Sequence, residues 1–169
     1  MDIKIKTEKE NFKYRVCGIL HHDGKYLGVK IADNKFFCLP GGHIEIGEDT
    51  EIAALREMEE ELGFPVKVKR LAGIAENFFE AKNGGVFHEL GFYYEVEAEN
   101  AADVNAEDYE RVEIDKGEPK KLVFKWFTKE DIANVDFRPP FVRDMINSNG
   151  MLHVICKKEK IEKEDEYTL

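Results

Sequence analysis

Residues 42 to 64, GHIEIGEDTEIAALREMEEELGF, carry the pattern that decides the fold. Asp49 or Thr50 can cap a helix, and Gly63 followed by Phe64-Pro65 can end it, so the stretch predicts a helix near residues 50–62 between two loops. At about 100° per residue, Glu57, Glu60 and Glu61 fall within one arc of that helix. The residues on the arc that faces away are apolar: Ala54, Leu55, Met58 and Leu62. One face therefore packs, and the other meets solvent or a ligand.

The three neighbouring glutamates are unfavourable for an isolated helix. Like charges three or four residues apart cost about 0.2–0.5 kcal/mol per pair, and the C-terminal end of a helix disfavours anions. A divalent cation reverses both effects, because Mg²⁺, Mn²⁺ and Ca²⁺ take hard oxygen ligands. The paired glycines Gly41 and Gly42 before the helix let the backbone approach such a ligand closely. The pattern favours a cation site, although acidic amphipathic helices are often plain solvated surfaces.

The same stretch resembles the Nudix hydrolase box, Gx5Ex7REUxEExGU, in which U is a bulky apolar residue. The residues that match are Gly42, Glu48, Arg56, Glu57, Met58, Glu60, Glu61, Gly63 and Phe64. Phe64 stands where an aliphatic residue is commoner, which concerns packing rather than chemistry. The flanking Leu39-Pro40-Gly41-Gly42, the preceding strand pair and the aromatic strand around Trp126 extend the resemblance more loosely along most of the chain.

This resemblance implies an α/β fold, the Nudix α/β/α sandwich with a mixed sheet. It also implies hydrolysis of a nucleoside diphosphate linked to another group, with Mg²⁺ or Mn²⁺ as cofactor. The residues that it implies as catalytic are Arg56, Glu57, Glu60 and Glu61. The implied metal ligands are the Gly42 carbonyl, Glu57, Glu60 and Glu61, with Gly41 and Glu48 in support. Arg56 would orient a glutamate, with Glu48 as its partner or as an outer ligand, and the general base stays unassigned within the glutamate cluster.

A further acid from outside the box is common in such proteins. Residues 98–120 are acidic and poor in large apolar side chains, and we interpret them as a long loop, which is often functional. Its candidate acids are Glu107, Asp108, Glu110, Glu113 and Glu118. Among them Glu118 is favoured as a metal ligand, because it stands just before the strand of Trp126.

Substrate contacts are less sharply indicated. Phe79, with Phe78, Tyr93 and Tyr94, can stack a base, although aromatic residues on strands more often pack in the core. His88 can contact phosphate or metal, and Arg138, before Pro139-Pro140, can contact phosphate. We take Phe79, His88 and Arg138 as the substrate-binding candidates. The partner that the resemblance implies is a small nucleotide-type diphosphate, and the sequence leaves the nucleotide itself open.

Composition limits the remaining choices. The 169 residues, 43% hydrophobic and 36% charged, suit one globular domain, which we place at residues 1–156 with a charged, disordered tail at 157–169. No apolar run or signal peptide stands out, so a cytoplasmic protein without a membrane partner is expected.

Cys17, Cys38 and Cys156 suit reduced thiols. The net charge of −10 argues against nucleic-acid polymers, and it means that cations must bridge a phosphate substrate to the protein. A homodimer is compatible with the resemblance.

The other elements follow from alternation and turn residues. Strands are predicted at residues 3–6, 12–21, 25–31, 36–38, 66–79, 86–96, 122–127 and 151–156, with hairpins at His22-Asp23-Gly24 and Asn83-Gly84-Gly85. Short helices are predicted after Thr128 and at 141–146.

Three rival functions stay open. The fold is also used by non-hydrolytic ligand-binding or regulatory modules, but these usually lose box glutamates, and this chain keeps them. A plain cation-binding protein is a second rival, although the alternating Asp/Asn loop of an EF-hand is absent. An isomerase acting on prenyl diphosphates is the third.

Overall fold

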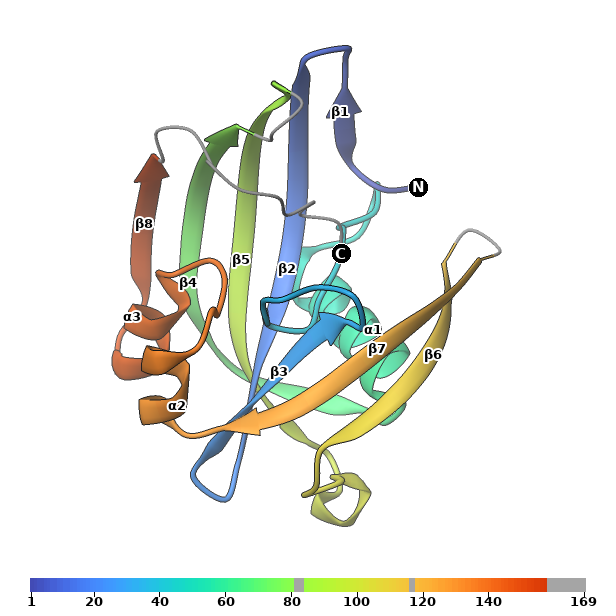
Figure 1. Ribbon diagram of the computed structural model, residues 1–169, viewed down its shortest axis with the longest axis vertical. Helices are drawn as coiled ribbons and strands as arrows, with labels where there is room; N and C mark the ends of the chain where they lie inside the picture. The colour runs from blue at the N-terminus through green and yellow to red at the C-terminus, as the bar shows by residue number, and fades with distance from the viewer. Residues whose placement is uncertain (81–83, 116–117, 158–169) are drawn as a thin grey trace.

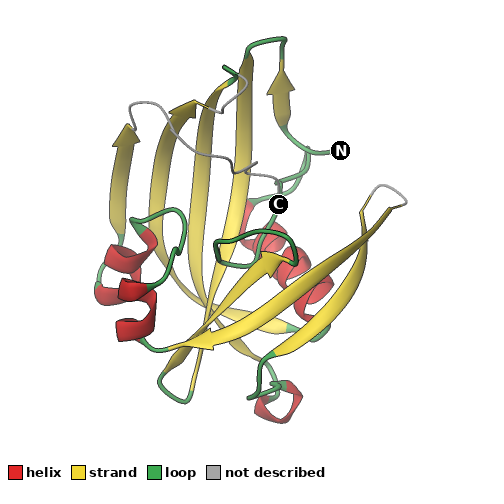
Figure 2. Cartoon of the chain, viewed as in Figure 1, coloured by secondary structure: helices red, strands yellow, loops and turns green. Residues whose placement is uncertain are grey.

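The computed structural model describes residues 1–80, 84–115 and 118–157, and it forms a mixed sheet with helices on both sides (Figures 1 and 2). The strands are β1 (Lys4–Lys6), β2 (Glu10–His22), β3 (Lys25–Ile31), β4 (Val66–Glu80), β5 (Val86–Ala98), β6 (Tyr109–Asp115), β7 (Glu118–Phe127) and β8 (Leu152–Lys157). The helices are α1 (Thr50–Leu62), α2 (Lys129–Asn134) and α3 (Val142–Asn147), with a 3₁₀ turn η1 at Ala101–Asp103. These bounds confirm the α/β prediction.

The strand order is β6-β7-β3-β2-β5-β4-β8, and β1 pairs with the free side of β2. The β2–β5 and β4–β8 pairs are parallel, and the other pairs are antiparallel. β2 and β3 pair only next to their turn, at His21–Tyr26 and His22–Lys25. Beyond that point the two strands diverge (Figure 1), so the sheet opens between them.

The loop that begins the box fills this opening along β2. Val16 N–H donates to the Gly42 carbonyl at 3.0 Å, and Gly18 N–H donates to the Pro40 carbonyl at 3.0 Å. Ile44 N–H completes the ladder by donating to the Tyr14 carbonyl at 3.0 Å. The paired glycines are thus held by backbone bonds against the middle of the sheet, in front of α1.

Alternate side chains of β2 and β5 enter two cores. Val16, Tyr94 and Val96 pack with Met58 and Leu62 of α1. On the opposite face, Ile19 and Tyr93 pack with Ile132 of α2, with Met145 of α3 and with Phe141, which precedes α3. This alternation is what places α1 and the α2–α3 pair on different sides of the strands.

Local chemistry explains the bounds of α1. The Asp49 side chain accepts hydrogen bonds from Glu51 N–H at 3.0 Å and Ile52 N–H at 2.9 Å. Gly63 ends the helix with φ of +82°, a left-handed conformation that glycine adopts without cost. The predicted helix at residues 50–62 is confirmed, and Asp49 rather than Thr50 is its cap.

Two predictions about local structure were wrong. Residues 36–38 form isolated bridges, Val29 with Cys38 and Phe37 with Phe137, rather than a strand. Residues 98–120 are not one long loop, because η1, β6 and the start of β7 lie within them. The predicted turn residue Asn83 and the tail from 158 lie outside the described residues.

Candidate functional site

The loop glycines determine how closely the box helix approaches the sheet. Gly41 has φ of +146°, and a side chain there would collide with the Val16 carbonyl. Gly42 lies against the carboxylate of Glu57, so that any Cβ at residue 42 would overlap both Glu57 oxygens. A side chain at residue 42 would therefore force the Glu57 carboxylate to move.

Arg56 organises the acids around it. Its Nε and Nη2 donate to the two Glu48 oxygens at 2.8 and 2.9 Å. Its Nη1 donates to Glu57 at 2.9 Å and to Glu60 at 3.3 Å, and Nη2 also donates to the His43 carbonyl at 3.0 Å. These bonds lower the pKa of Glu48, and the acids raise the pKa of Arg56. One planar guanidinium thus fixes three carboxylates and the loop backbone.

The three helix glutamates differ in burial. The side chain of Glu60 is 55% exposed, that of Glu57 is 14% exposed, and Glu61 is buried with 6% of its surface exposed. Burial raises the pKa of Glu57. The Glu61 carboxylate accepts a hydrogen bond from Gly41 N–H at 3.1 Å. Burial and, after it, the Glu113 and Glu57 carboxylates raise the pKa of Glu61 to about 8.

Glu113 reaches Glu61 from β6, the strand that the sequence did not predict. Its neighbour Arg111, two residues earlier on the same face, donates from Nη1 to the Glu61 backbone carbonyl at 2.7 Å. The guanidinium of Arg111 also lies where a side chain at Gly63 would be. Arg111 therefore joins β6 to the C-terminal end of α1, where a cation is electrostatically favourable.

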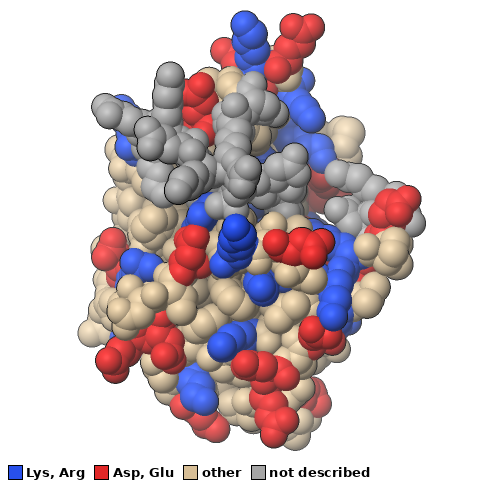
Figure 3. Space-filling model, viewed as in Figure 1, with Lys and Arg blue, Asp and Glu red and all other residues tan. Residues whose placement is uncertain are grey.

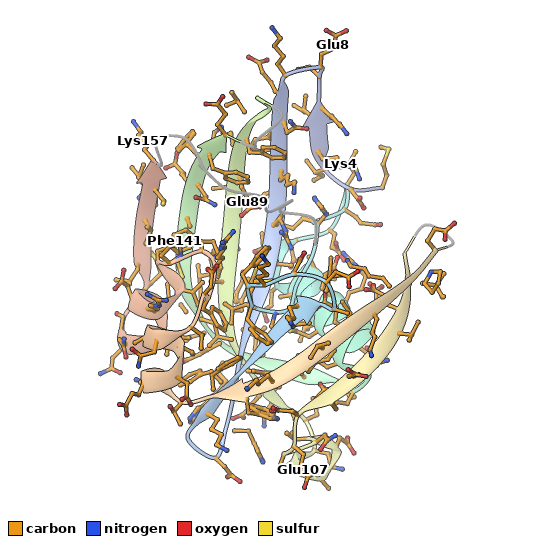
Figure 4. The ribbon with its side chains drawn as sticks, in the orientation of Figure 1. Lys4, Glu8, Glu89, Glu107, Phe141 and Lys157 are labelled. Atoms are coloured by element: carbon orange, nitrogen blue, oxygen red, sulfur yellow. The ribbon has the colours of Figure 1, made fainter. Side chains whose placement is uncertain are left out.

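Glu118 takes a different place from the one expected. Glu118 is exposed, and its backbone is the register partner of Asp115 at the end of the β6–β7 hairpin. This end of the hairpin projects away from β2 and β5 (Figure 1). Glu107 lies beside η1, far from the labelled Glu89 (Figure 4). Of the five acids considered, Glu113 is the one whose carboxylate perturbs Glu61, and the sequence offered no signal to prefer it.

The substrate candidates are spread over the sheet. Phe79 is buried and stacks on Phe87, with ring centroids 4.8 Å apart. His88 lies on the opposite face of β5, stacked on Phe78 with centroids 4.3 Å apart. Arg138 is paired with Asp136 through two bonds of 2.8 and 2.6 Å.

The donor set suits a hard divalent cation. Glu61 is a buried carboxyl with a raised pKa, and the carboxylates of Glu113 and Glu57 lie near it. A bound cation would reduce the repulsion among these carboxylates, as protonation of Glu61 does. The carboxylates that would supply the oxygens are those of Glu57, Glu60, Glu61 and Glu113. The Gly42 carbonyl already accepts from Val16 N–H, so a metal would use its second lone pair. Glu60 is turned toward Arg56, and within residues 1–80, 84–115 and 118–157 no three acids, histidines or cysteines are grouped tightly enough to hold an ion.

Two other properties bear on the chemistry. Burial raises the pKa of Cys17 to about 12, which makes that thiol a poor nucleophile, and all three cysteines are free. The face shown in Figure 3 carries basic and acidic side chains side by side. Among the described helices, none is long and apolar enough to cross a membrane.

Comparison with known proteins decides the family. The model of the NUDIX domain matches residues 14–146. The chain belongs to the Nudix family. Nudix relatives include an ADP-ribose pyrophosphatase of Methanocaldococcus jannaschii, 42% identical over 82 residues that cover 42% of this chain and 48% of that protein. The nucleoside triphosphatase NudI of Salmonella agona is 45% identical over 53 residues, which cover 28% and 38%. The matches thus span about half or less of these relatives.

The Nudix fold is also found in a solved structure of a MutT protein from Bacillus halodurans. That structure has a TM-score of 0.60 and 19% identity, and the match covers 83% of this chain and 86% of that one. The likeness confirms the predicted fold, with a mixed sheet and a few helices.

Proposed function

We propose that this Nudix chain hydrolyses a pyrophosphate linkage in a nucleoside diphosphate joined to a further group, with Mg²⁺ or Mn²⁺ as cofactor. The observation that carries the proposal is the buried carboxyl of Glu61, whose pKa is raised to about 8 beside Glu57 and Glu113. Perturbed acids of this kind are characteristic of functional sites. A complete box is folded around them.

The residues of the chain take distinct parts in the proposed reaction. Glu57, Glu60, Glu61 and Glu113 would hold the cation, with the Gly42 carbonyl beside Glu57. When bound, the cation neutralises the pyrophosphate and lowers the pKa of water for attack on phosphorus. Arg56 keeps Glu57 and Glu60 in place while Glu48 holds Arg56. The proton of the attacking water passes to a carboxylate of this cluster, and we assign no single glutamate as the base.

Names of relatives suggest two kinds of substrate. One is the ADP-ribose of the Methanocaldococcus protein, and the other is the nucleoside triphosphate of NudI. Both contain a nucleotide attached through a phosphoanhydride bond, which is the class that we propose here. A non-hydrolytic ligand-binding or regulatory module is the second candidate, favoured because the described residues bring no three acids, histidines or cysteines close enough together to hold an ion.

The test is hydrolysis of a nucleotide panel with Mg²⁺ or Mn²⁺, with products resolved by chromatography. We expect the wild-type protein to cleave a phosphoanhydride bond and to lose this activity when the metal is chelated. The Glu57→Gln variant should lose the activity as well, with an unchanged melting temperature. Binding of a nucleotide with no turnover under either metal would instead establish the non-hydrolytic module.

We also propose that residues 1–156 form a single domain, since one continuous sheet extends from β1 to β8. A cytoplasmic location, a homodimer and the absence of nucleic-acid polymers as partners stay predictions.

A further inference from the structure

Three polar side chains are buried in the described part of the chain: Glu61, Asn77 and Glu89. Glu61 belongs to the box. Asn77 on β4 and Glu89 on β5 are register partners, so they lie side by side on one face of the sheet. Across residues 1–80, 84–115 and 118–157, neither the Asn77 amide nor the Glu89 carboxylate makes a side-chain hydrogen bond. Neither group is among the fully enclosed side-chain atoms of the described residues that lack a partner, which are Arg15 Nε, His43 Nε2 and Arg143 Nε, so the polar atoms of Asn77 and Glu89 keep some contact with solvent.

Arg15 on β2 adds a third incomplete group to the same face. Its neighbour on that face, Lys13, is the register partner of Glu89. The Nη1 atom of Arg15 lies 3.7 Å from Glu89 Oε2, which is an ion pair but too long for a hydrogen bond. Its Nε is buried and has no acceptor. We name Arg15, Asn77 and Glu89 the polar trio.

The polar trio lies next to the proposed reaction site. Arg15 Nη2 donates to the Gly41 carbonyl at 3.1 Å, and Gly41 N–H donates to Glu61. The Arg15 guanidinium therefore connects Glu89 to the loop that contacts the box acids. The labelled Glu89 lies on β5 within the body of the sheet (Figure 4). On the same face, the next register pair is Phe79 and Phe87, whose rings stack on each other with Phe79 buried.

The chemistry of the trio limits what it can bind. An ionised carboxylate only accepts hydrogen bonds, the Asn77 amide can both accept and donate, and Arg15 only donates. A ligand there must bring hydrogen-bond donors to Glu89 and an acceptor to Arg15 or Asn77. On a nucleotide, such donors are amino or imino groups of the base or hydroxyl groups of a sugar.

We propose that the polar trio recognises the non-phosphate part of the substrate, with Glu89 accepting hydrogen bonds from its donor groups. This inference rests on the proposed function, because it assigns the substrate end of the same site. A carboxylate buried for this purpose rejects an analogue that lacks the donor, since the carboxylate, which lies too far from Arg15 for a hydrogen bond, is then left without one.

The experiment uses pairs of nucleotides that differ by one donor. Guanosine and inosine nucleotides differ by an amino group, and ribose and 2′-deoxyribose nucleotides differ by a hydroxyl. KM and kcat are measured for wild type, Glu89→Gln and Asn77→Ser, and the metal-free affinities are measured by calorimetry in EDTA. The matched control is Glu76→Gln, because Glu76 adjoins Asn77 on the other face and bonds His153 at 2.9 Å.

Wild type is expected to prefer the donor-bearing member of one pair by about 10-fold or more in kcat/KM and in affinity. Glu89→Gln should abolish that preference through KM, with kcat little changed, and Asn77→Ser should weaken it without touching the Arg15–Glu89 pair. The pair that responds identifies base or sugar as the source. Glu76→Gln should keep the preference.

Two results would overturn the inference. One is a wild type that discriminates within neither pair. The other is a Glu89→Gln protein that loses kcat equally on every substrate, as expected if the pair with Arg15 merely holds Gly41. If the protein binds the donor-bearing nucleotide preferentially in EDTA but turns over no nucleotide under any metal, the result supports recognition by the polar trio and contradicts the proposed hydrolysis. Failure of the inference and failure of the proposed function are therefore distinguishable.

Discussion

The backbone of Gly42 lies in contact with the carboxylate of Glu57, closely enough that a side chain at residue 42 would displace that carboxylate. Gly42 also accepts a backbone hydrogen bond from Val16 at 3.0 Å, so the loop cannot move aside without breaking its ladder to β2. If residue 42 is replaced by a larger residue, the Glu57 side chain is therefore the group that must move. This makes the position of that carboxylate a property of the loop as much as of the helix.

Gly42→Ala should lower kcat by about 100-fold, because displacement of a positioned group by about 1 Å has effects of that size. The melting temperature should change little by comparison, since Glu57 is a side chain that can rotate away. Gly150→Ala is the control, because its Cβ would meet nothing closer than Ser148 Oγ at 3.9 Å. Equal activity of the two variants would mean that the contact with Glu57 has no catalytic consequence.

Much of the site could be predicted from the sequence, because its determinants are local. The cap Asp49 and the terminator Gly63 act within a few residues, and they set the bounds of α1. The spacing of Glu48 and Arg56 likewise brings their side chains together across the helix entry. Short-range rules were sufficient for these features.

The missed strand β6 shows where such rules fail. Its inward face carries Arg111 and Glu113, and charged residues at core-facing positions hide the alternation that indicates a strand. The partner of Arg111 is the Glu61 carbonyl, 50 residues earlier in the chain. Arg15 is similar, because a charge inside an apolar strand acquires meaning only through its distant neighbours Gly41 and Glu89. Such contacts depend on the tertiary structure.

Arg56→Lys should reduce kcat strongly although the charge is kept. A lysine ammonium cannot bind both Glu48 oxygens and reach Glu57, Glu60 and the His43 carbonyl from one plane. The free energy of unfolding should fall by about 1–2 kcal/mol, as for a partly exposed charged network. Steady-state kinetics and urea titration measure the two effects. A lysine variant with wild-type kcat would show that the fork geometry is unnecessary.

The metal-free protein should lose stability as the pH rises from about 4.5 to about 8. The pKa of Glu61 is raised from 4.5 to about 8 by burial and by neighbouring carboxylates. The folded state then binds more protons than the unfolded state within that window, and the resulting stabilisation is complete below it and lost above it. Melting temperatures in EDTA from pH 5 to 9 test this. Glu61→Gln should flatten the profile, and an unchanged slope in that variant would assign the effect to other groups.

Arg111→Ala should weaken the binding of Mg²⁺ or Mn²⁺ by about 10-fold, the effect expected when the support of a ligand is removed. The substitution deletes the 2.7 Å bond to the Glu61 carbonyl, which joins β6 to α1 and holds Glu113 near Glu61. Glu113→Gln should weaken the ion similarly, while Lys121→Ala, which removes an exposed pair with Glu110 on the same hairpin, should not. Titration calorimetry gives the affinities without turnover. If Arg111→Ala binds the ion as wild type does while Glu113→Gln does not, Glu113 reaches its position without help from Arg111, and the bond to α1 is structural.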